Sequence, residues 1–287
     1  MSNDSTTRKP RIARFAAVSA VVATLTLVST ATAHDFWLIP DMFAFSGDTT
    51  VHVNGRSGLR FPDGSAVQPA RVADARIIGA NSQTRITEMT VEGTSLRLHH
   101  KPTAAGQYLV VVGLTPRTTR TTPAGLIRYL KAEGGAGEAA RIERENTFAD
   151  MDSVVYTGAS YGATILQFGN GGPRAFSLTA GFPLEFVPMT DPAHVHMGDT
   201  LHVKILGAGK PVPNIGVDAS PAFDSTAAPG TSGAVTLTAD ANGVLHLPLT
   251  KAGPWMLRSA YVGRRPGSPG EWDVARSTYV FSVGGKH

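Results

Sequence analysis

Cysteine is absent from this chain of 287 residues. Its absence excludes disulfides, thiolate metal sites and cysteine nucleophiles. A domain without disulfides must be stabilised by its packed core, and a chain with 42% hydrophobic residues is long enough to form one. Strong metal ligands must therefore be nitrogen or oxygen donors. The chain supplies nine histidines, all at or after position 34.

Charge is also scarce, because only 17% of the residues are charged and the formal net charge is +4. Four of the 26 basic residues and one of the 22 acidic residues precede position 34. The rest of the chain therefore carries 22 basic and 21 acidic residues, which is too even a balance for a basic patch that binds phosphates. We predict that nucleic acid is not a partner.

Long hydrophobic runs are missing from most of the chain, and the one run near its start is short. Residues 15–28 are uncharged and apolar, but a membrane-spanning helix needs about 20 such residues. Basic residues precede the run, and Ala31 and Ala33 fit the small-residue positions of a signal-peptidase site. We predict a signal peptide at 1–33, cleaved after Ala33. The mature chain then starts at His34, has no membrane span, and is periplasmic or secreted.

The remaining chain has a mostly β pattern. Short segments alternate apolar and polar residues and are separated by Gly, Pro, Asn and Asp, which is typical of half-buried strands. The strands predicted in the first part are 50–53, 71–77, 85–91, 95–99 and 107–113. Their spacing favours a sandwich over βαβ units. We therefore predict an N-terminal β-sandwich domain at 34–121.

A short helical segment comes after this domain. Thr122 can cap the N-terminus of a helix whose first residue is Pro123, and Gly134 can end it. The apolar stripe of this helix consists of Leu126, Ile127 and Leu130. A second, charged helical piece is predicted at 138–144. We interpret 122–174 as a helical and extended connector that packs on the first domain.

The strand pattern then resumes and predicts a second sandwich. Its predicted strands are 182–188, 201–206, 215–219, 234–238, 244–249, 255–262 and 278–283. About seven strands in about 105 residues is typical of an immunoglobulin-like domain. A turn is predicted at 240–243 and a flexible loop at 225–233. We predict this immunoglobulin-like β-sandwich domain at 175–287.

Seven motifs occur in order along the chain. They are His-Asp-Phe-Trp-Leu-x-Pro at 34–40, His-Val at 52–53, Tyr-Leu-x-x-Glu-Gly at 129–134, Pro-Leu-Glu-Phe-Val-Pro and Asp-Pro within 183–192, Gly-Lys-Pro at 209–211, Asp-x-x-Gly at 240–243, and Gly-x-Trp-x-Leu at 253–257. With these motifs the chain resembles a family of exported proteins that carry a domain of unknown function and are loosely labelled nickel-uptake-associated. The resemblance implies a periplasmic protein that handles a transition metal. Similar proteins often have a histidine where this chain has Tyr261.

Two histidines are the first candidate metal ligands. At a free N-terminus, His34 offers its α-amine and its Nδ1 as a chelate, and a second histidine completes a three-nitrogen site that suits Cu and then Ni. His52 stands between Val51 and Val53, so on a strand it faces away from those core residues. We predict that His34 and His52 bind a divalent nickel, copper or cobalt ion. The alternative is that both are ordinary surface histidines.

A second candidate cluster consists of His194, His196 and His202. His-x-His places two imidazoles on one face of an extended chain, but a histidine-rich loop beside a strand is the alternative interpretation. His99 and His100 are adjacent, so on a strand they point to opposite faces. His246 lies between two leucines and is predicted to face solvent.

Catalytic patterns are weak. Gly-x-Ser-x-Gly occurs at 158–162, but a nucleophile elbow needs a strand before it and a helix after it, which this region is not predicted to supply. Trp37, Trp255 and Trp272 are predicted to lie in the core rather than to form a sugar-binding platform. We therefore do not predict an enzyme.

The leading hypothesis is a periplasmic binding protein that captures or buffers a divalent metal for uptake or delivery, with a membrane metal transporter as its partner. One alternative is a copper-dependent oxidative enzyme that uses an N-terminal histidine brace. The other is an immunoglobulin-like adhesion or interaction module without a metal.

Overall fold

The computed structural model describes residues 1, 34–222, 233–268 and 270–285. The predicted signal peptide after Met1, most of the predicted loop at 225–233, and His287 lie outside the described residues. The chain divides into two compact units, Met1–Thr32 and Ala33–His287. All helices and strands of the described residues belong to the second unit.

Three β-sheets make up this unit. The N-terminal sheet contains β1 (Asp35–Pro40), β3 (Val51–Arg60), β4 (Asp63–Ala66), β7 (Met89–Glu92) and β8 (Ser95–His100). The C-terminal sheet contains β12 (Leu184–Pro188), β13 (Thr200–Gly207), β14 (Lys210–Pro211) and β17 (Val244–Pro248). The central sheet contains β2 (Ala44–Phe45), β5 (Val72–Gly79), β6 (Ser82–Arg85), β9 (Gly106–Leu114), β10 (Arg117–Thr121), β11 (Val154–Phe168), β15 (Gly216–Pro221), β16 (Val235–Thr238), β18 (Gly253–Arg264) and β19 (Glu271–Val283). The two 3-10 helices are η1 (Pro69–Arg71) and η2 (Pro192–His194).

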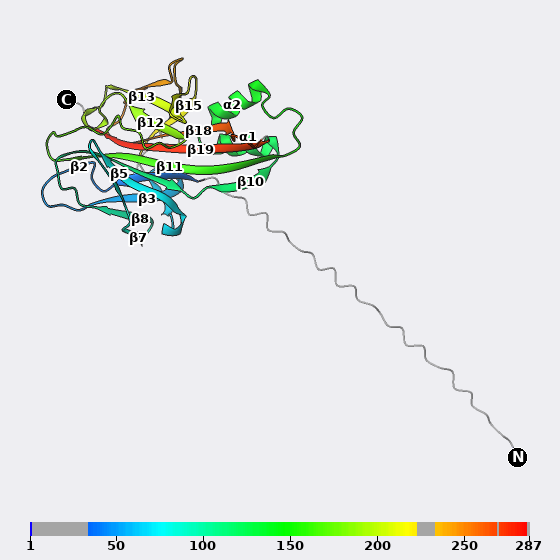
Figure 1. The fold of residues 1–287 in the computed structure, drawn as a ribbon, viewed down its shortest axis with the longest axis horizontal. Coiled ribbons are helices and arrows are strands. Elements are labelled where there is room, and N and C mark those ends of the chain that lie inside the picture. Colours follow the sequence, from blue (N-terminus) through cyan, green and yellow to red (C-terminus); the bar gives the residue numbers. More distant parts are fainter. Residues whose placement is uncertain (2–33, 223–232, 269, 286–287) are drawn as a thin grey trace. The chain divides into compact units, whose positions relative to one another are not determined.

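The central sheet runs through both halves of the chain, and β11 is the strand that joins them. Near its end β11 pairs antiparallel with β9, and over most of its length it pairs parallel with β19. In Figure 1 it crosses the middle of the molecule beside β19. Residues 154–168, which the sequence assigned to a connector, therefore lie at the centre of a ten-stranded sheet.

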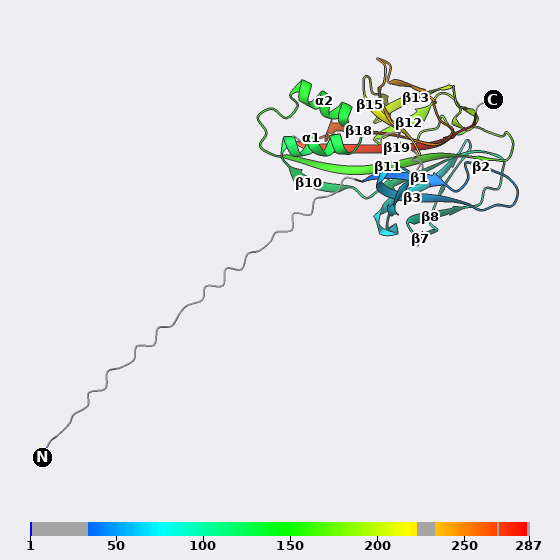
Figure 2. The ribbon, with the colours of Figure 1, turned by 180° about the vertical axis from the view of Figure 1, so that it is seen from behind.

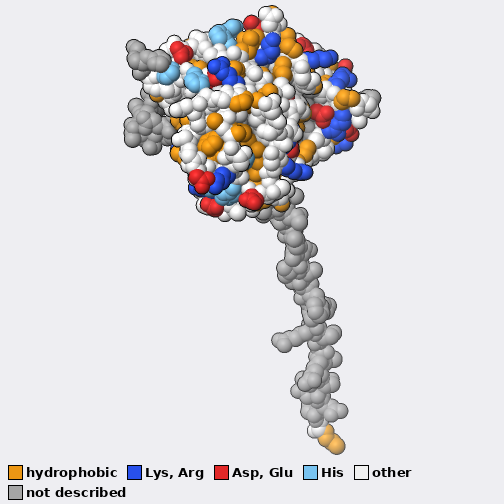
Figure 3. Space-filling model, turned by 60° about the vertical axis from the view of Figure 1, so that its left-hand side comes forward, with side chains coloured by type: hydrophobic (Ala, Val, Ile, Leu, Met, Phe, Trp, Pro, Cys, Tyr) orange, Lys and Arg blue, Asp and Glu red, His pale blue; other side chains and the backbone are white. Residues whose placement is uncertain are grey.

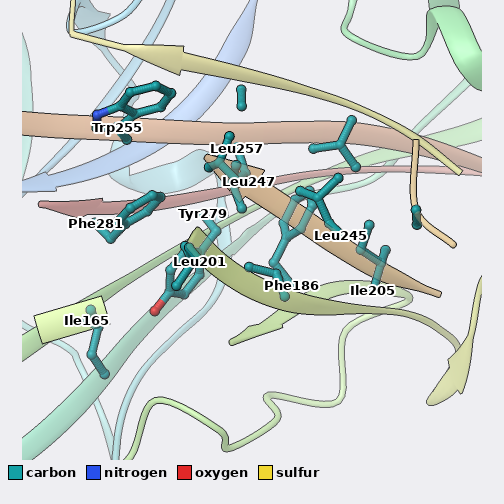
Figure 4. Close-up of a cluster of buried hydrophobic side chains, with 14 of the residues drawn as sticks. Ile165, Phe186, Leu201, Ile205, Leu245, Leu247, Trp255, Leu257, Tyr279 and Phe281 are labelled. Carbon is teal, nitrogen blue, oxygen red and sulfur yellow. The ribbon is translucent and has the colours of Figure 1, made fainter. Parts of the chain in front are cut away.

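Each outer sheet closes one sandwich against the central sheet. Figures 1 and 2 show the N-terminal and C-terminal sheets on opposite sides of β11 and β19. One core, which includes Phe36, Leu38 and Leu96, fills the space between the N-terminal and central sheets. The other core includes Ile165 and Leu201 and fills the space on the C-terminal side (Figure 4). Burying one such side chain contributes about 1.5–3 kcal/mol. The prediction of a mostly β chain with two sandwiches is confirmed.

Two helices follow β10, and the first has a side-chain N-cap. α1 (Pro123–Ala132) begins after Thr122, whose hydroxyl accepts a hydrogen bond from the backbone N–H of Gly125, and α2 (Ala136–Glu145) comes directly after it. Their packing differs from the prediction. Their apolar side chains contact Val262 of β18 and Trp272 of β19 rather than the N-terminal sheet. The reason is that β18 and β19 extend beyond the sandwich and offer an apolar face that these helices cover.

Most predicted strands are present, with one clear exception. The segment 85–91 does not form a single strand, because β6 ends at Arg85 in the central sheet and β7 begins at Met89 in the N-terminal sheet. The three tryptophans are buried, as predicted. In the described part of the chain, no helix has the length and apolar character that a membrane crossing requires.

Candidate functional site

The first two candidate ligands lie at opposite ends of a pair of strands. β1 and β3 are antiparallel, with Asp35 opposite Gly58 and Pro40 opposite Val53. His34 precedes β1, whereas the carbonyl of His52 accepts a hydrogen bond from the backbone N–H of Asp41, just after β1 ends. At about 3.3 Å per residue, this register separates the two histidines by about 20 Å. The structure therefore does not bring His34 and His52 into one site.

His52 instead faces His99 on the neighbouring strand. The two residues are register partners between β3 and β8. Their Nδ1 atoms lie 3.0 Å apart, and their rings are nearly perpendicular at 86°, with centroids 4.9 Å apart. Both side chains are half-buried on the solvent side of the N-terminal sheet, because Val51 and Val53 occupy its core side. We call this arrangement the His52–His99 pair.

Polar side chains surround the Nε2 atom of His99. The Nε2 of His99 lies 3.1 Å from the hydroxyl of Thr90 and 3.9 Å from a carboxylate oxygen of Glu92. Arg97 connects the same carboxylate, at 3.2 Å, to that of Asp41, at 3.4 Å. Metal-binding histidines commonly have a hydroxyl, carbonyl or carboxylate at their second ring nitrogen, which sets the tautomer and the ring orientation. The His52–His99 pair therefore has the polar surroundings of a ligand pair.

His100 faces the other way, as predicted. Its ring packs against that of Tyr108, with centroids 5.9 Å apart. Burial lowers the pKa of His100, so its imidazole stays neutral at physiological pH. His100 therefore belongs to the packing between the sheets rather than to the His52–His99 pair.

The second predicted cluster separates in the structure. His194 Nδ1 contacts Asp191 at 3.1 Å. His196 forms a bridge with Gly284, and its backbone N–H donates to Asp199 over 2.8 Å. His202 lies on β13 and contacts His246 instead. Figure 3 shows histidine side chains gathered at the upper left of one face of the molecule and another near its lower edge.

His202 has a different partner, His246 on β17. The two are register partners, with Nδ1 atoms 2.8 Å apart and ring centroids 4.9 Å apart. The Nε2 of His246 lies 3.6 Å from a carboxylate oxygen of Asp240. This His202–His246 pair repeats, on another sheet, the arrangement of the His52–His99 pair.

A buried ion cluster fixes the strand that begins after His34. Asp35 pairs with Arg258, which also reaches Asp218 at 3.2 Å. Burial raises the pKa of Asp35, and the guanidinium of Arg258 opposes that rise. In the same cluster, Arg276 pairs with the buried Glu133. The cluster therefore brings the motif at 34–40, which contains Asp35, together with the motif at 129–134, which contains Glu133.

The serine of the Gly-x-Ser-x-Gly motif belongs to the same cluster. Ser160 lies in the middle of β11, and its hydroxyl accepts a hydrogen bond from Arg276 over 2.6 Å. The chain does not turn into a helix after Ser160, since β11 continues to Phe168. The side chain is therefore a structural hydrogen-bond acceptor and not an exposed nucleophile.

The two histidine pairs have the spacing of a metal chelate. Two nitrogens at right angles on one metal, with bonds of about 2.0–2.1 Å, lie about 2.9 Å apart. In a tetrahedral arrangement they lie about 3.3 Å apart with the same bonds. The observed distances are 3.0 and 2.8 Å. Without a metal, one ring N–H donates to the facing nitrogen.

Each histidine pair supplies two protein ligands to a metal ion. Among the described residues there is no group of three or more His, Cys, Asp or Glu side chains that could hold a metal ion. Water must therefore fill the remaining positions of any ion bound by a pair, which leaves such an ion open to exchange.

The architecture is that of a mainly β protein in which two sandwiches share one long sheet. The chain belongs to the family described as Domain of unknown function (DUF4198), whose model matches residues 31–263. No curated protein matches the chain.

Several solved structures are similar at low identity. The D0-D1 domain of intimin is 14% identical, with 87% of this chain and 98% of that chain covered and a TM-score of 0.21. Trypsin-activated alpha-2-macroglobulin from Escherichia coli is 12% identical with a TM-score of 0.24, and this chain covers 16% of its length and aligns over 88% of its own. Murine CEACAM1b is 12% identical, with 88% and 100% covered and a TM-score of 0.19. At these TM-scores the likenesses support no statement about function.

Proposed function

We propose that this protein captures a divalent transition metal, Cu or Ni, at the His52–His99 pair. The observation that carries the proposal is the distance of 3.0 Å between the two Nδ1 atoms. This distance matches two neighbouring ligands of a square arrangement, the geometry that Cu(II) and Ni(II) prefer with nitrogen donors. Cobalt, which the sequence also suggested, accepts neighbouring ligands at right angles as well and stays a candidate ion.

The surroundings of the pair support a cation. Two carboxylates, Asp41 and Glu92, and one guanidinium, Arg97, lie on this surface. The carboxylate of Glu92 lies 3.9 Å from His99 Nε2 and favours a cation at the pair. Half-exposed side chains and water ligands suit an ion that is captured and released rather than one held permanently.

Export and delivery complete the proposal. A signal peptide at 1–33 would place the protein in the periplasm or outside the cell, where it could meet metal ions before a membrane transporter does. His34, with its free α-amine after cleavage, remains a separate candidate ligand about 20 Å from His52, a distance that results from about 3.3 Å per strand residue. An oxidative enzyme with a histidine brace needs a second histidine beside His34, and the register does not make His52 that partner.

Metal titration of the chain that starts at His34 tests the proposal. We expect Cu²⁺ and Ni²⁺ to bind, and we expect His52→Ala and His99→Ala each to weaken binding at this site at least tenfold. His194→Ala is the matched control, since its side chain is exposed and lies in η2. Equal affinity at this site in all four proteins would refute the proposal.

A further inference from the structure

We propose that His202 and His246 form a second transition-metal site, with the carboxylate of Asp240 orienting one of its two ligands. The site lies on the C-terminal sheet and rests on its own geometry, so it goes beyond the proposed role of the His52–His99 pair. We expect the site to bind a divalent ion that prefers nitrogen ligands, such as Cu²⁺ or Ni²⁺.

Strand alternation places both imidazoles on the outer face of the sheet. Leu201 and Val203 on β13 are fully buried, as are Leu245 and Leu247 on β17. Side chains of a strand alternate between its faces. His202 and His246 stand between these buried residues and therefore point outward. His246 retains 54% of its side-chain exposure. Water and dissolved ions therefore reach the pair.

The distance between the rings matches a chelate. The two Nδ1 atoms lie 2.8 Å apart, against about 2.9 Å for two nitrogens at right angles on one metal. The rings meet at 80°. In the proposed site, a common ion bound by both Nδ1 atoms takes the place of the proton that they share.

The carboxylate of Asp240 lies beside the second ring nitrogen of His246. One of its carboxylate oxygens accepts hydrogen bonds from the backbone N–H groups of Asn242 at 2.8 Å and Val244 at 2.9 Å. These bonds hold the carboxylate, and its other oxygen lies 3.6 Å from His246 Nε2. A carboxylate at this nitrogen favours a proton there and leaves Nδ1 free for the metal.

The electrostatic surroundings are nearly balanced. Lys204 lies two residues after His202 on the same face of β13, opposite Val244. Its positive charge opposes a cation, and the carboxylate of Asp240 offsets it. Affinity therefore comes from the two imidazoles rather than from a general negative field.

Site-resolved NMR of the chain from His34 onward, with CuCl₂ as the probe, tests this site. Substoichiometric Cu²⁺ should broaden the imidazole signals of His202 and His246, and His246→Ala should abolish the broadening at His202. Asp240→Asn should weaken binding at this pair by about 10–100-fold, as loss of an orienting partner does at other sites. His194→Ala is the control and should leave the broadening unchanged.

The outcomes separate this site from the first one. Broadening at His202 and His246 alone supports the second site and refutes the first. Broadening at His52 and His99 alone refutes the second site. Cu²⁺ broadening at His202 that persists in His246→Ala, with the backbone spectrum unchanged, also overturns the proposal, because it means that the imidazoles do not act as a pair.

Discussion

His52 and His99 face each other across neighbouring antiparallel strands, with their Nδ1 atoms 3.0 Å apart. The residues are 47 positions apart in the chain, and only the register between β3 and β8 brings them together. The same relationship joins His202 and His246 on another sheet. These two outward-facing histidine pairs on separate sheets are the observations on which the proposed metal binding rests.

Adding one alanine ahead of His34 distinguishes the N-terminus from the His52–His99 pair. The addition converts the α-amine of His34 into a peptide amide, so the chelate of α-amine and Nδ1 within one residue is lost. Because the strand register separates the two by about 20 Å at about 3.3 Å per residue, we expect Cu²⁺ affinity at the pair to stay within about twofold of the parent. Calorimetric titration measures this. A loss of all Cu²⁺ binding would instead place the site at the N-terminus.

Removing one partner of the buried ion pair should be costly. Glu133→Gln leaves the guanidinium of Arg276 without its carboxylate, and the side chain of Glu133 is fully buried. We expect the free energy of unfolding to fall by about 3–5 kcal/mol, measured by urea denaturation. Glu143→Gln is the matched control, because Glu143 pairs with Lys131 on the surface. Its effect should not exceed about 1 kcal/mol, and equal losses in both variants would contradict the buried-pair assignment.

Tyr279 offers a test of burial. Its hydroxyl has no hydrogen-bond partner among the described residues, so Tyr279→Phe should keep or raise the free energy of unfolding by up to about 1 kcal/mol. Tyr108→Phe is the matched comparison. It removes a hydroxyl that donates to the carbonyl of Ala104 over 2.6 Å, and it should lower that free energy by about 1 kcal/mol.

Tyr279→Phe should also change how the free energy of unfolding responds to alkaline pH. Burial raises the pKa of Tyr279 above its usual 10.0, and the nearby carboxylate of Asp191 adds to the rise. When the pH rises above 10.0, the unfolded chain loses the phenol proton while the folded chain keeps it. The free energy of unfolding therefore falls as the pH increases. In Tyr279→Phe the decline should be shallower by about 1.4 kcal/mol per pH unit. Parallel declines in the two proteins would mean that Tyr279 ionises in the folded state.

Much of the fold could be predicted from local patterns. Alternation predicted most strands, and Thr122 and Pro123 predicted the start of α1 because capping depends on neighbouring residues alone. The shared central sheet could not be predicted in this way. β11 is rich in small residues such as Gly158, Ala159 and Gly162, which weaken the alternation, and its pairing with β19 joins segments more than 100 residues apart.

The candidate site was predicted in part. The sequence placed His52 and His246 on outward strand faces, and both lie there. Their partners, His99 and His202, were not recognised, because pairing depends on register between distant strands and local pattern does not specify it. The valine or leucine on both sides of His52, His202 and His246 was the available signal.

Pulsed EPR of the Cu²⁺-loaded His246→Ala variant tests the central claim most directly, since of the two histidine pairs this variant leaves only the His52–His99 pair intact. With one equivalent of Cu²⁺, we predict the signature of two coordinated imidazoles. Adding His99→Ala should reduce this to one imidazole or abolish binding. A spectrum that is the same with and without His99 would contradict the account.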